Sequence, residues 1–194
     1  AILALFLFLY VMLDGFDLGV GILSITASSE ERRSILMTSL GNVWDANETW
    51  LVLAVGLLLV AFPDAHGVVL NQLYLPTALM LLGLILRGTA FDFRTKAKDN
   101  HKNLWDHSFV FGSLLTALTQ GYMLGLYIVG FERNLITIGF SILVGICLAA
   151  SYCFIGSVWL ILKTEGELQK ESIKLTKILL WWTTLGMALI SSVT

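Results

Sequence analysis

Long apolar segments dominate this chain and leave it few folds to adopt. About 20 consecutive apolar residues span the hydrocarbon core of a bilayer as an α-helix. Five segments follow this pattern, and they cover residues 1–27, 43–63, 66–91, 106–130 and 135–162; a sixth, truncated segment covers residues 178–194. In lipid, the backbone polar groups of such a segment are satisfied within a helix. We therefore predict one all-α integral membrane domain over residues 1–194, with a four-helix transmembrane bundle followed by a fifth and a truncated sixth helix.

Composition supports the same class. Of the 194 residues, 57% are hydrophobic and 13% are charged, and the mean hydropathy is +0.82, which is outside the range of soluble domains. The net charge of −2 provides no general basic field for nucleic acid. Because the chain starts without methionine and stops within an apolar run, we expect it to be a fragment of a longer protein.

Basic residues occur almost entirely in alternate connections. The connections after the first, third and fifth spans hold ten of them, whereas those after the second and fourth hold only Arg133. The ten are Arg32, Arg33, Arg94, Lys96, Lys98, Lys102, Lys163, Lys170, Lys174 and Lys177. By the positive-inside rule these connections face the cytoplasm, so the N-terminus is expected outside.

Ionisable residues also occur within the spans, toward the expected cytoplasmic side. Because charge that faces lipid costs ~2.5 to 3.5 kcal/mol per residue, we expect these side chains to turn inward and meet at one level of the bundle. They are Asp14 and Asp17 in the first span, Asp45 and Glu48 at the start of the second, Arg87 and Asp92 at the end of the third, and Asp106 and His107 at the start of the fourth.

The spacing of these acids favours shared helix faces. Asp14 lies three residues from Asp17, and Asp45 lies three residues from Glu48. Neighbouring carboxylates in a low dielectric resist joint ionisation, so at least one of each pair is expected to hold a proton unless Arg87 compensates. Such a group can pass protons. The alternative is a cluster of buried ion pairs that only stabilises the packing of the helices. The residues themselves leave both interpretations open.

Histidine and metal-ligand patterns point away from a cofactor in this chain. A haem between membrane helices needs histidine or methionine ligands well inside the bundle. His66 and His101 fall in expected connections, and His107 lies at a helix start. No paired histidine and carboxylate motif of the metal-binding type occurs. We expect neither haem nor metal to be bound here.

Several motifs occur in a fixed order along the chain. They are DGFDLGVG, then ERR leading to NVWDANETWLV, then RGTAFDFRTK, NLWDHSFVFGS and KTEGELQ. Together they resemble subunit II of the cytochrome bd quinol oxidases, including the cyanide-insensitive branch, over nearly the whole chain. The resemblance implies a haem-free subunit of a respiratory oxidase in the prokaryotic cytoplasmic membrane. Such enzymes oxidise quinol, reduce oxygen to water and take the protons from the cytoplasm.

The resemblance also implies a partner and site residues. The partner is a haem-bearing subunit I that carries haems b and d, and a quinone is associated with subunit II in some members. Asp17 and Asp45 match the family's buried acidic positions, and Asp45 is tied most closely to a proton route toward subunit I. A second polar set near the cytoplasmic face is matched by Arg87, Asp92, Lys96 and Asp106. None is expected to be catalytic, because the oxygen chemistry belongs to the haem.

Two other functions stay open at this stage. An independent proton-coupled transporter half would also place carboxylates and an arginine inside the membrane. A purely structural scaffold would stabilise a haem subunit without moving protons. Family members are also longer than this chain, with two related bundles, so the chain is expected to cover only the first bundle and part of the second.

Overall fold

The predicted all-α membrane class is confirmed. A computed structural model describes residues 1–41 and 43–193, with the backbone alone for 99, 100 and 193. The described residues form α-helices joined by short connections and one 3₁₀ turn, and they contain no strand. The helices are α1 (Ile2–Leu23), α2 (Glu30–Ser39), α3 (Trp44–Ala61), α4 (Pro63–Lys96), α5 (Asp99–Ile128), α6 (Leu135–Lys163) and α7 (Gly166–Val193). Six candidate spans among the described residues are long and apolar enough to cross a membrane.

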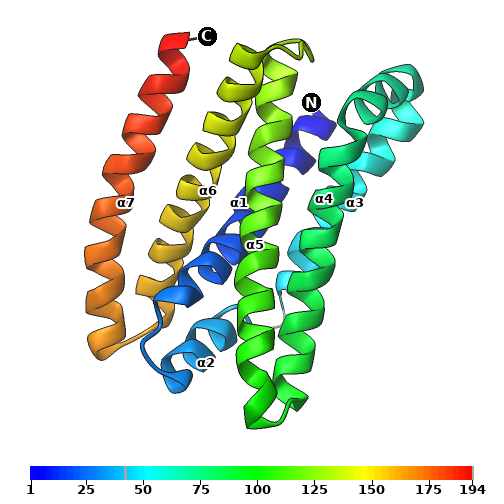
Figure 1. Cartoon of the computed structure of the whole chain (residues 1–194). Helices are drawn as coiled ribbons and strands as arrows, with labels where there is room; N and C mark the ends of the chain where they lie inside the picture. The colour runs from blue at the N-terminus through cyan, green and yellow to red at the C-terminus, as the bar shows by residue number, and fades with distance from the viewer. Residues whose placement is uncertain (42, 194) are drawn as a thin grey trace.

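The long helices pack side by side around α5 (Figure 1). Helix α5 lies between α4 and α6, and α1 packs against α3, α5 and α6. Helix α7 packs on α6 at the outer edge of the molecule. The polar side chains of α1, α3, α4 and α5 can therefore reach one another, whereas α7 contributes to the periphery.

Several helices extend beyond the apolar spans of the sequence. Helix α4 continues to Lys96 and α5 already begins at Asp99, so most of the polar stretch between those spans is helical. Helix α7 begins at Gly166 rather than near residue 178. Hydropathy marks only the part of a helix that matches the hydrocarbon core, whereas backbone hydrogen bonding continues past it. Asn42, which opens the third motif, and Thr194, which ends the last expected span, lie outside the described residues.

Helix α2 is a short amphipathic element that the span analysis did not predict. The Ser29 side chain caps its N-terminus by accepting a hydrogen bond from the backbone N–H of Arg32 at 3.2 Å. Two glutamates in its first turn favour the positive end of the helix dipole. Leu36 and Met37 are buried beneath it, so α2 lies against the ends of the spanning helices rather than crossing the bilayer.

Glycines bring the helices close together beside the polar residues. A Cβ atom added to Gly19 on α1 would overlap the backbone carbonyl of Tyr152 on α6. A Cβ added to Gly112 on α5 would lie 2.7 Å from the backbone nitrogen of Arg87 on α4. Such small residues let backbones approach closely in membrane bundles. Helices α1 and α6 therefore cross next to candidate site residues, and so do helices α4 and α5.

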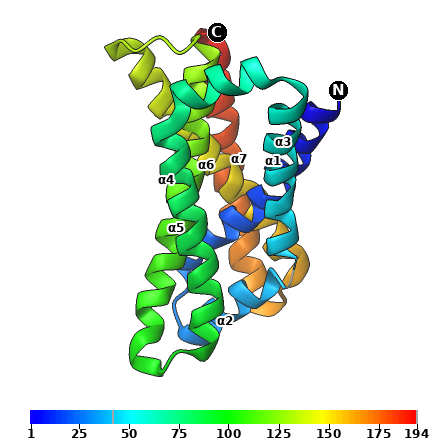
Figure 2. The same cartoon turned by 90° about the vertical axis from the view of Figure 1, so that its right-hand side faces the viewer.

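The basic connections share one end of the molecule. The segments between α1 and α3, between α4 and α5 and between α6 and α7 lie together at the lower end in Figures 1 and 2. The start of α1 and the two remaining connections lie at the opposite end. The charge asymmetry along the sequence is thus an asymmetry between two ends of the structure.

Candidate functional site

A buried ion pair between α4 and α1 forms the centre of the site. The Arg87 NH1 group donates to Asp14 Oδ1 at 2.7 Å, and both side chains are only 1% exposed. Removing two charges from water is costly, and a short charge-assisted hydrogen bond offsets part of that cost. The pair therefore depends on the helix crossing that brings the two residues together.

Helix α3 brings further groups to the same guanidinium. The Glu48 Oε1 atom lies 3.2 Å from Arg87 NH2, and the Glu48 side chain is 22% exposed. One turn earlier on α3, the centroid of the Trp44 ring lies 5.6 Å from the guanidinium carbon of Arg87, within the range of a cation–π contact. Arg87 is thus held from two neighbouring helices.

A second carboxylate of α1 is held by an amide from α3. The Asn47 Nδ2 group donates to Asp17 Oδ2 at 2.7 Å, and Asp17 is fully buried. We call Asp14, Asp17, Asn47, Glu48 and Arg87 the Arg87 cluster. Sequence reasoning did not single out Asn47, although its position between two acids in an apolar span was an available signal.

Asp106 lies in a separate group nearer the basic end. Its carboxylate accepts from the Nε of Arg94 on α4 and, at 2.8 Å, from NH1 of Arg33 on α2. Arg94 NH1 also donates to Ser34 Oγ at 3.0 Å. We call these four residues the Asp106 cluster. Seven residues separate Arg94 from Arg87, which puts them on one face of α4 about 10 Å apart along its axis.

The expectation of one polar level is therefore corrected to two levels. Sequence reasoning placed Asp106 beside the other acids, but the length of α4 between its two arginines separates the groups. Arg94 was counted only among the basic residues of a connection. Its spacing of two helical turns from Arg87 was the signal that could have assigned it to the interior.

Four of the predicted residues are exposed in this chain. They are Asp45, Asp92, Lys96 and His107. Asp92 and Lys96 flank Arg94 along α4 but point away from the face that Arg87 and Arg94 share. Asp45 lies in the first turn of α3, where its charge still acts on Glu48. Helix rotation, which the sequence spans did not define, accounts for all four corrections.

A chain of neutral polar groups continues from Asp14 into the helix bundle. The Tyr152 hydroxyl on α6 donates to Gln120 Oε1 on α5 at 2.8 Å, and Gln120 Nε2 donates to the Tyr10 hydroxyl on α1. Both tyrosines are buried. Tyr10 lies one helical turn before Asp14 on α1. Sequence reasoning missed this chain, although Gln120 is a polar residue in an apolar span.

Several polar atoms of the site have no hydrogen-bond partner among the described residues. They are Asp14 Oδ2, Asp17 Oδ1, Glu48 Oε1, Arg87 NH2 and Arg94 NH2. Glu48 Oε1 and Arg87 NH2 form the ion pair described above, but without the geometry of a hydrogen bond. Internal waters commonly satisfy such buried groups. Four of the five atoms belong to the Arg87 cluster, so this cluster combines three carboxyl groups with unfilled hydrogen-bonding capacity.

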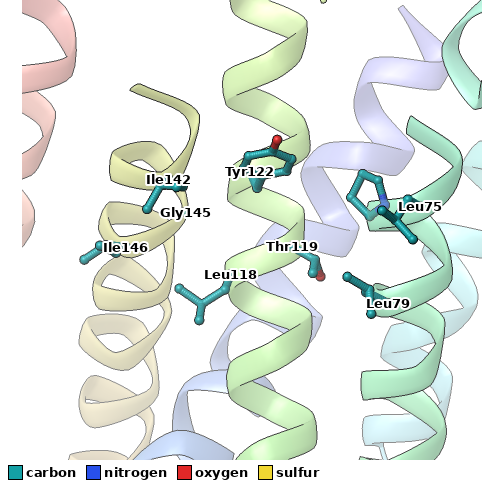
Figure 3. Close-up of a pocket in the computed structure, with 9 residues that line it drawn as sticks. Leu75, Leu79, Leu118, Thr119, Tyr122, Ile142, Gly145 and Ile146 are labelled. Carbon is teal, nitrogen blue, oxygen red and sulfur yellow. The ribbon is translucent and has the colours of Figure 1, made fainter. Parts of the chain in front are cut away.

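An apolar groove lies apart from these clusters (Figure 3). Its volume is about 420 Å³, and it is lined by side chains of α4, α5 and α6, among them Leu79, Leu118 and Ile146. Its surface is almost entirely apolar, so it offers no acid–base chemistry.

Metal-ligand residues do not gather in the part of the chain that the structure describes. No group of three or more histidine, cysteine, aspartate or glutamate side chains there could hold a metal ion. His66 lies in the first turn of α4, and His101 lies in the first turn of α5. His107 is exposed further along α5.

Comparisons with known proteins agree on one family. Residues 1–194 match the family described as cytochrome bd terminal oxidase subunit II. The chain is similar to cytochrome bd ubiquinol oxidase subunit 2 of Bacillus subtilis strain 168, with 32% identity over 182 residues that cover 87% of the chain and 53% of that protein. It is also similar to cytochrome bd-I ubiquinol oxidase subunit 2 of Escherichia coli strain K12, with 28% identity over 175 residues that cover 82% of this chain and 46% of that protein. The chain spans about half the length of the curated relatives it matches.

Proposed function

The chain belongs to the cytochrome bd terminal oxidase subunit II family, and from this membership we propose that it serves as the haem-free subunit of a respiratory quinol:oxygen oxidoreductase. In this role it pairs with a haem-bearing subunit I, supports the assembly of the enzyme and helps to take up protons from the cytoplasm. Haems b and d belong to the partner, and quinol is the reductant of the complete enzyme. The positions of the histidines, at helix beginnings or on the surface, support this division.

The orientation follows from the two unlike ends of the molecule. The basic connections lie together at one end, and Arg133 is the basic residue of the connections at the other. Under the positive-inside rule the basic end faces the cytoplasm and α1 begins outside. The Asp106 cluster then lies near the cytoplasmic surface, and the Arg87 cluster lies about two helical turns deeper.

The Arg87 cluster is the observation that carries the proton role. The carboxyl groups of Asp14 and Glu48 pair with one buried guanidinium, and the charge of the buried Asp17 also acts on it. Full ionisation of all three would leave uncompensated negative charge in a low dielectric. A group in this position can bind and release a proton without moving a helix, and the unpartnered atoms around it provide places for water.

The decreasing exposure of three acidic side chains indicates the order in which a proton from the cytoplasm would meet them. Asp45 is exposed in the first turn of α3, Glu48 is partly exposed one turn further, and Asp14 is fully buried behind it. We assign these residues to successive positions from the surface inward. The Asp106 cluster has a supporting role, because two arginines hold its carboxylate and join α2, α4 and α5.

Substitution of Glu48 in the full-length, assembled oxidase tests this proposal. Glu48→Gln keeps the size of the side chain but removes its exchangeable carboxyl proton. Quinol-driven oxygen consumption should fall while the haem absorption spectrum and the co-purification of the partner stay unchanged. Glu132→Gln, in the connection at the opposite end, is a matched control that should keep normal turnover.

The same experiment separates the competing functions. Normal turnover in Glu48→Gln would contradict a proton role for this position. Joint loss of haem and partner would instead support the scaffold interpretation. A full-length wild-type protein that purifies without a haem-bearing partner would contradict the oxidase assignment and favour a transporter.

A further inference from the structure

The chain of hydrogen bonds from Tyr152 through Gln120 to Tyr10 has a defined direction. Tyr152 donates to the oxygen of the Gln120 amide, and the nitrogen of that amide donates to the Tyr10 oxygen. The Tyr10 oxygen is therefore an acceptor in this contact, and its own hydrogen is available for another group. A phenol can donate and accept at the same time.

Asp14 is the acceptor next to that free hydrogen. Its side chain interacts with the Tyr10 hydroxyl one turn before it on α1. The Oδ1 atom of Asp14 accepts from Arg87, whereas Oδ2 makes no hydrogen bond among the described residues. Tyr10 is only 4% exposed and Asp14 is fully buried, so bulk water does not compete freely for the hydroxyl.

The opposite orientation of the amide would satisfy fewer groups. If the Gln120 oxygen and nitrogen were exchanged, Tyr10 would donate to Gln120 and would no longer be available to Asp14. Asp14, whose Oδ2 atom makes no hydrogen bond among the described residues, would then face the oxygen of Tyr10 rather than its hydrogen. A buried acceptor without a donor is costly, so the orientation that directs every hydrogen toward Asp14 is favoured.

We infer that Gln120 is a positioning residue: its side-chain amide directs the Tyr10 hydroxyl toward Asp14 and so sets the hydrogen bonding of the carboxylate that pairs with Arg87. Gln120 itself does not touch Asp14. An amide holds both of its hydrogens on nitrogen, so this chain orients Asp14 and does not conduct protons onward. The inference rests on the proposed role of the Arg87 cluster and adds a residue to it.

Other groups also act on Asp14, and the test must separate them from Gln120. They are Asp17 on α1, Glu48 on α3, Arg87 on α4 and Tyr152 on α6. The variant of choice is Gln120→Met, which keeps the length of the side chain and removes both hydrogen bonds. Thr119→Val is the matched control, because the Thr119 hydroxyl donates to Leu115 O within α5 and has no link to Asp14.

The experiment uses infrared difference spectra of the full-length, assembled oxidase. Carboxylate signals that disappear in Asp14→Asn belong to Asp14. We expect these signals to shift in the same way in Gln120→Met and in Tyr10→Phe, to show no further shift when both substitutions are combined, and to stay in place in Thr119→Val. Unshifted signals in Gln120→Met would overturn the inference, and so would a shift that persists undiminished in the Tyr10→Phe background.

Two further readouts make the result decisive. If Gln120→Met does not assemble, Tyr10→Phe and Tyr152→Phe test the same chain from its two ends, and unshifted Asp14 signals in both would overturn the inference. Quinol-driven turnover is measured in parallel. Shifted Asp14 signals with normal turnover would uphold the positioning role while contradicting the proposed proton role, so the two failures can be told apart.

Discussion

Arg87 and Asp14 are 73 residues apart in the chain, yet Arg87 NH1 lies 2.7 Å from Asp14 Oδ1. Both side chains are almost fully buried in the interior of the bundle. This pair joins α4 to α1, two helices without an extensive direct interface of their own. The contact is made possible by α5 and α3, which pack against both partners, and by glycines that shorten the neighbouring crossings. The ion pair is therefore a product of the whole bundle.

Removal of Arg87 should destabilise the subunit strongly. Arg87→Met leaves Asp14 as a buried charge without its cation, which costs about 3 to 5 kcal/mol when a buried pair is broken. The expected result is a lower midpoint of thermal unfolding in detergent. Arg32→Met is the control, because its pair with Glu171 is largely exposed and such pairs contribute about 1 kcal/mol or less. Equal effects of the two substitutions would contradict the central role of Arg87.

The crossing of α1 and α6 should not tolerate a side chain at Gly19. In Gly19→Ala the added methyl group would overlap the Tyr152 carbonyl, and overpacking of this kind costs about 1 to 3 kcal/mol. We expect a lower yield of assembled protein and a lower unfolding midpoint. Gly56→Ala in α3 meets no atom within 4 Å and should be neutral or slightly stabilising. A neutral Gly19→Ala would show that the two helices can separate.

Asp106 should hold α2 in place. In Asp106→Asn the carboxylate that accepts from Arg33 and Arg94 is lost, and the arginines then repel each other near the basic end. Amide hydrogen exchange within residues 30–39 should become faster, because α2 loses its link to α5. Glu167→Gln, which breaks an exposed pair within α7, should leave exchange in α2 unchanged. If amide exchange within α2 stayed unaltered in Asp106→Asn, the apolar contacts of α2 alone would hold this helix in place, and the prediction would be wrong.

Arg133 should compensate for a proline in α4. Pro76 has no N–H to donate to the Gln72 carbonyl, and Arg133 NH2 donates to that oxygen at 2.5 Å. Arg133→Met should therefore destabilise the wild type by about 1 kcal/mol, the net contribution of a hydrogen bond of this kind. In a Pro76→Ala background the helix supplies its own donor, so the same substitution should cost less. Additive effects in this double-mutant cycle, followed by unfolding midpoints, would contradict the compensation.

Thiol labelling should report the proposed orientation. In intact cells, a membrane-impermeant maleimide should modify Glu132→Cys, in the connection with few basic residues, and should not modify Lys98→Cys. Disruption of the membrane should expose both positions to the reagent. The native Cys147 and Cys153 lie within α6, and the wild type reports their background. The reverse pattern of labelling would place the N-terminus in the cytoplasm.

Much of the architecture could be predicted from local properties of the chain. Apolar length predicted spanning helices because a bilayer sets both the span of a helix and the need to satisfy its backbone. The alternation of basic connections predicted two unlike ends, and the ordered motifs predicted the family. Helix bounds at the polar ends were less well predicted, because hydropathy does not register helical turns that continue past the hydrocarbon core.

In the candidate site, too, some features could be predicted from single segments of the chain and others only from the packed structure. The sequence by itself determined which acids and which arginine occur within the spans, since composition and spacing are properties of one segment. Only the tertiary structure decided that Asp14, Asp17 and Glu48 gather around Arg87, that Asp106 belongs to a second group, and that Asp45, Asp92 and Lys96 face outward. The reason is geometric: the rotation of each helix about its axis and its depth relative to its neighbours depend on close contacts between segments, and no single segment encodes them.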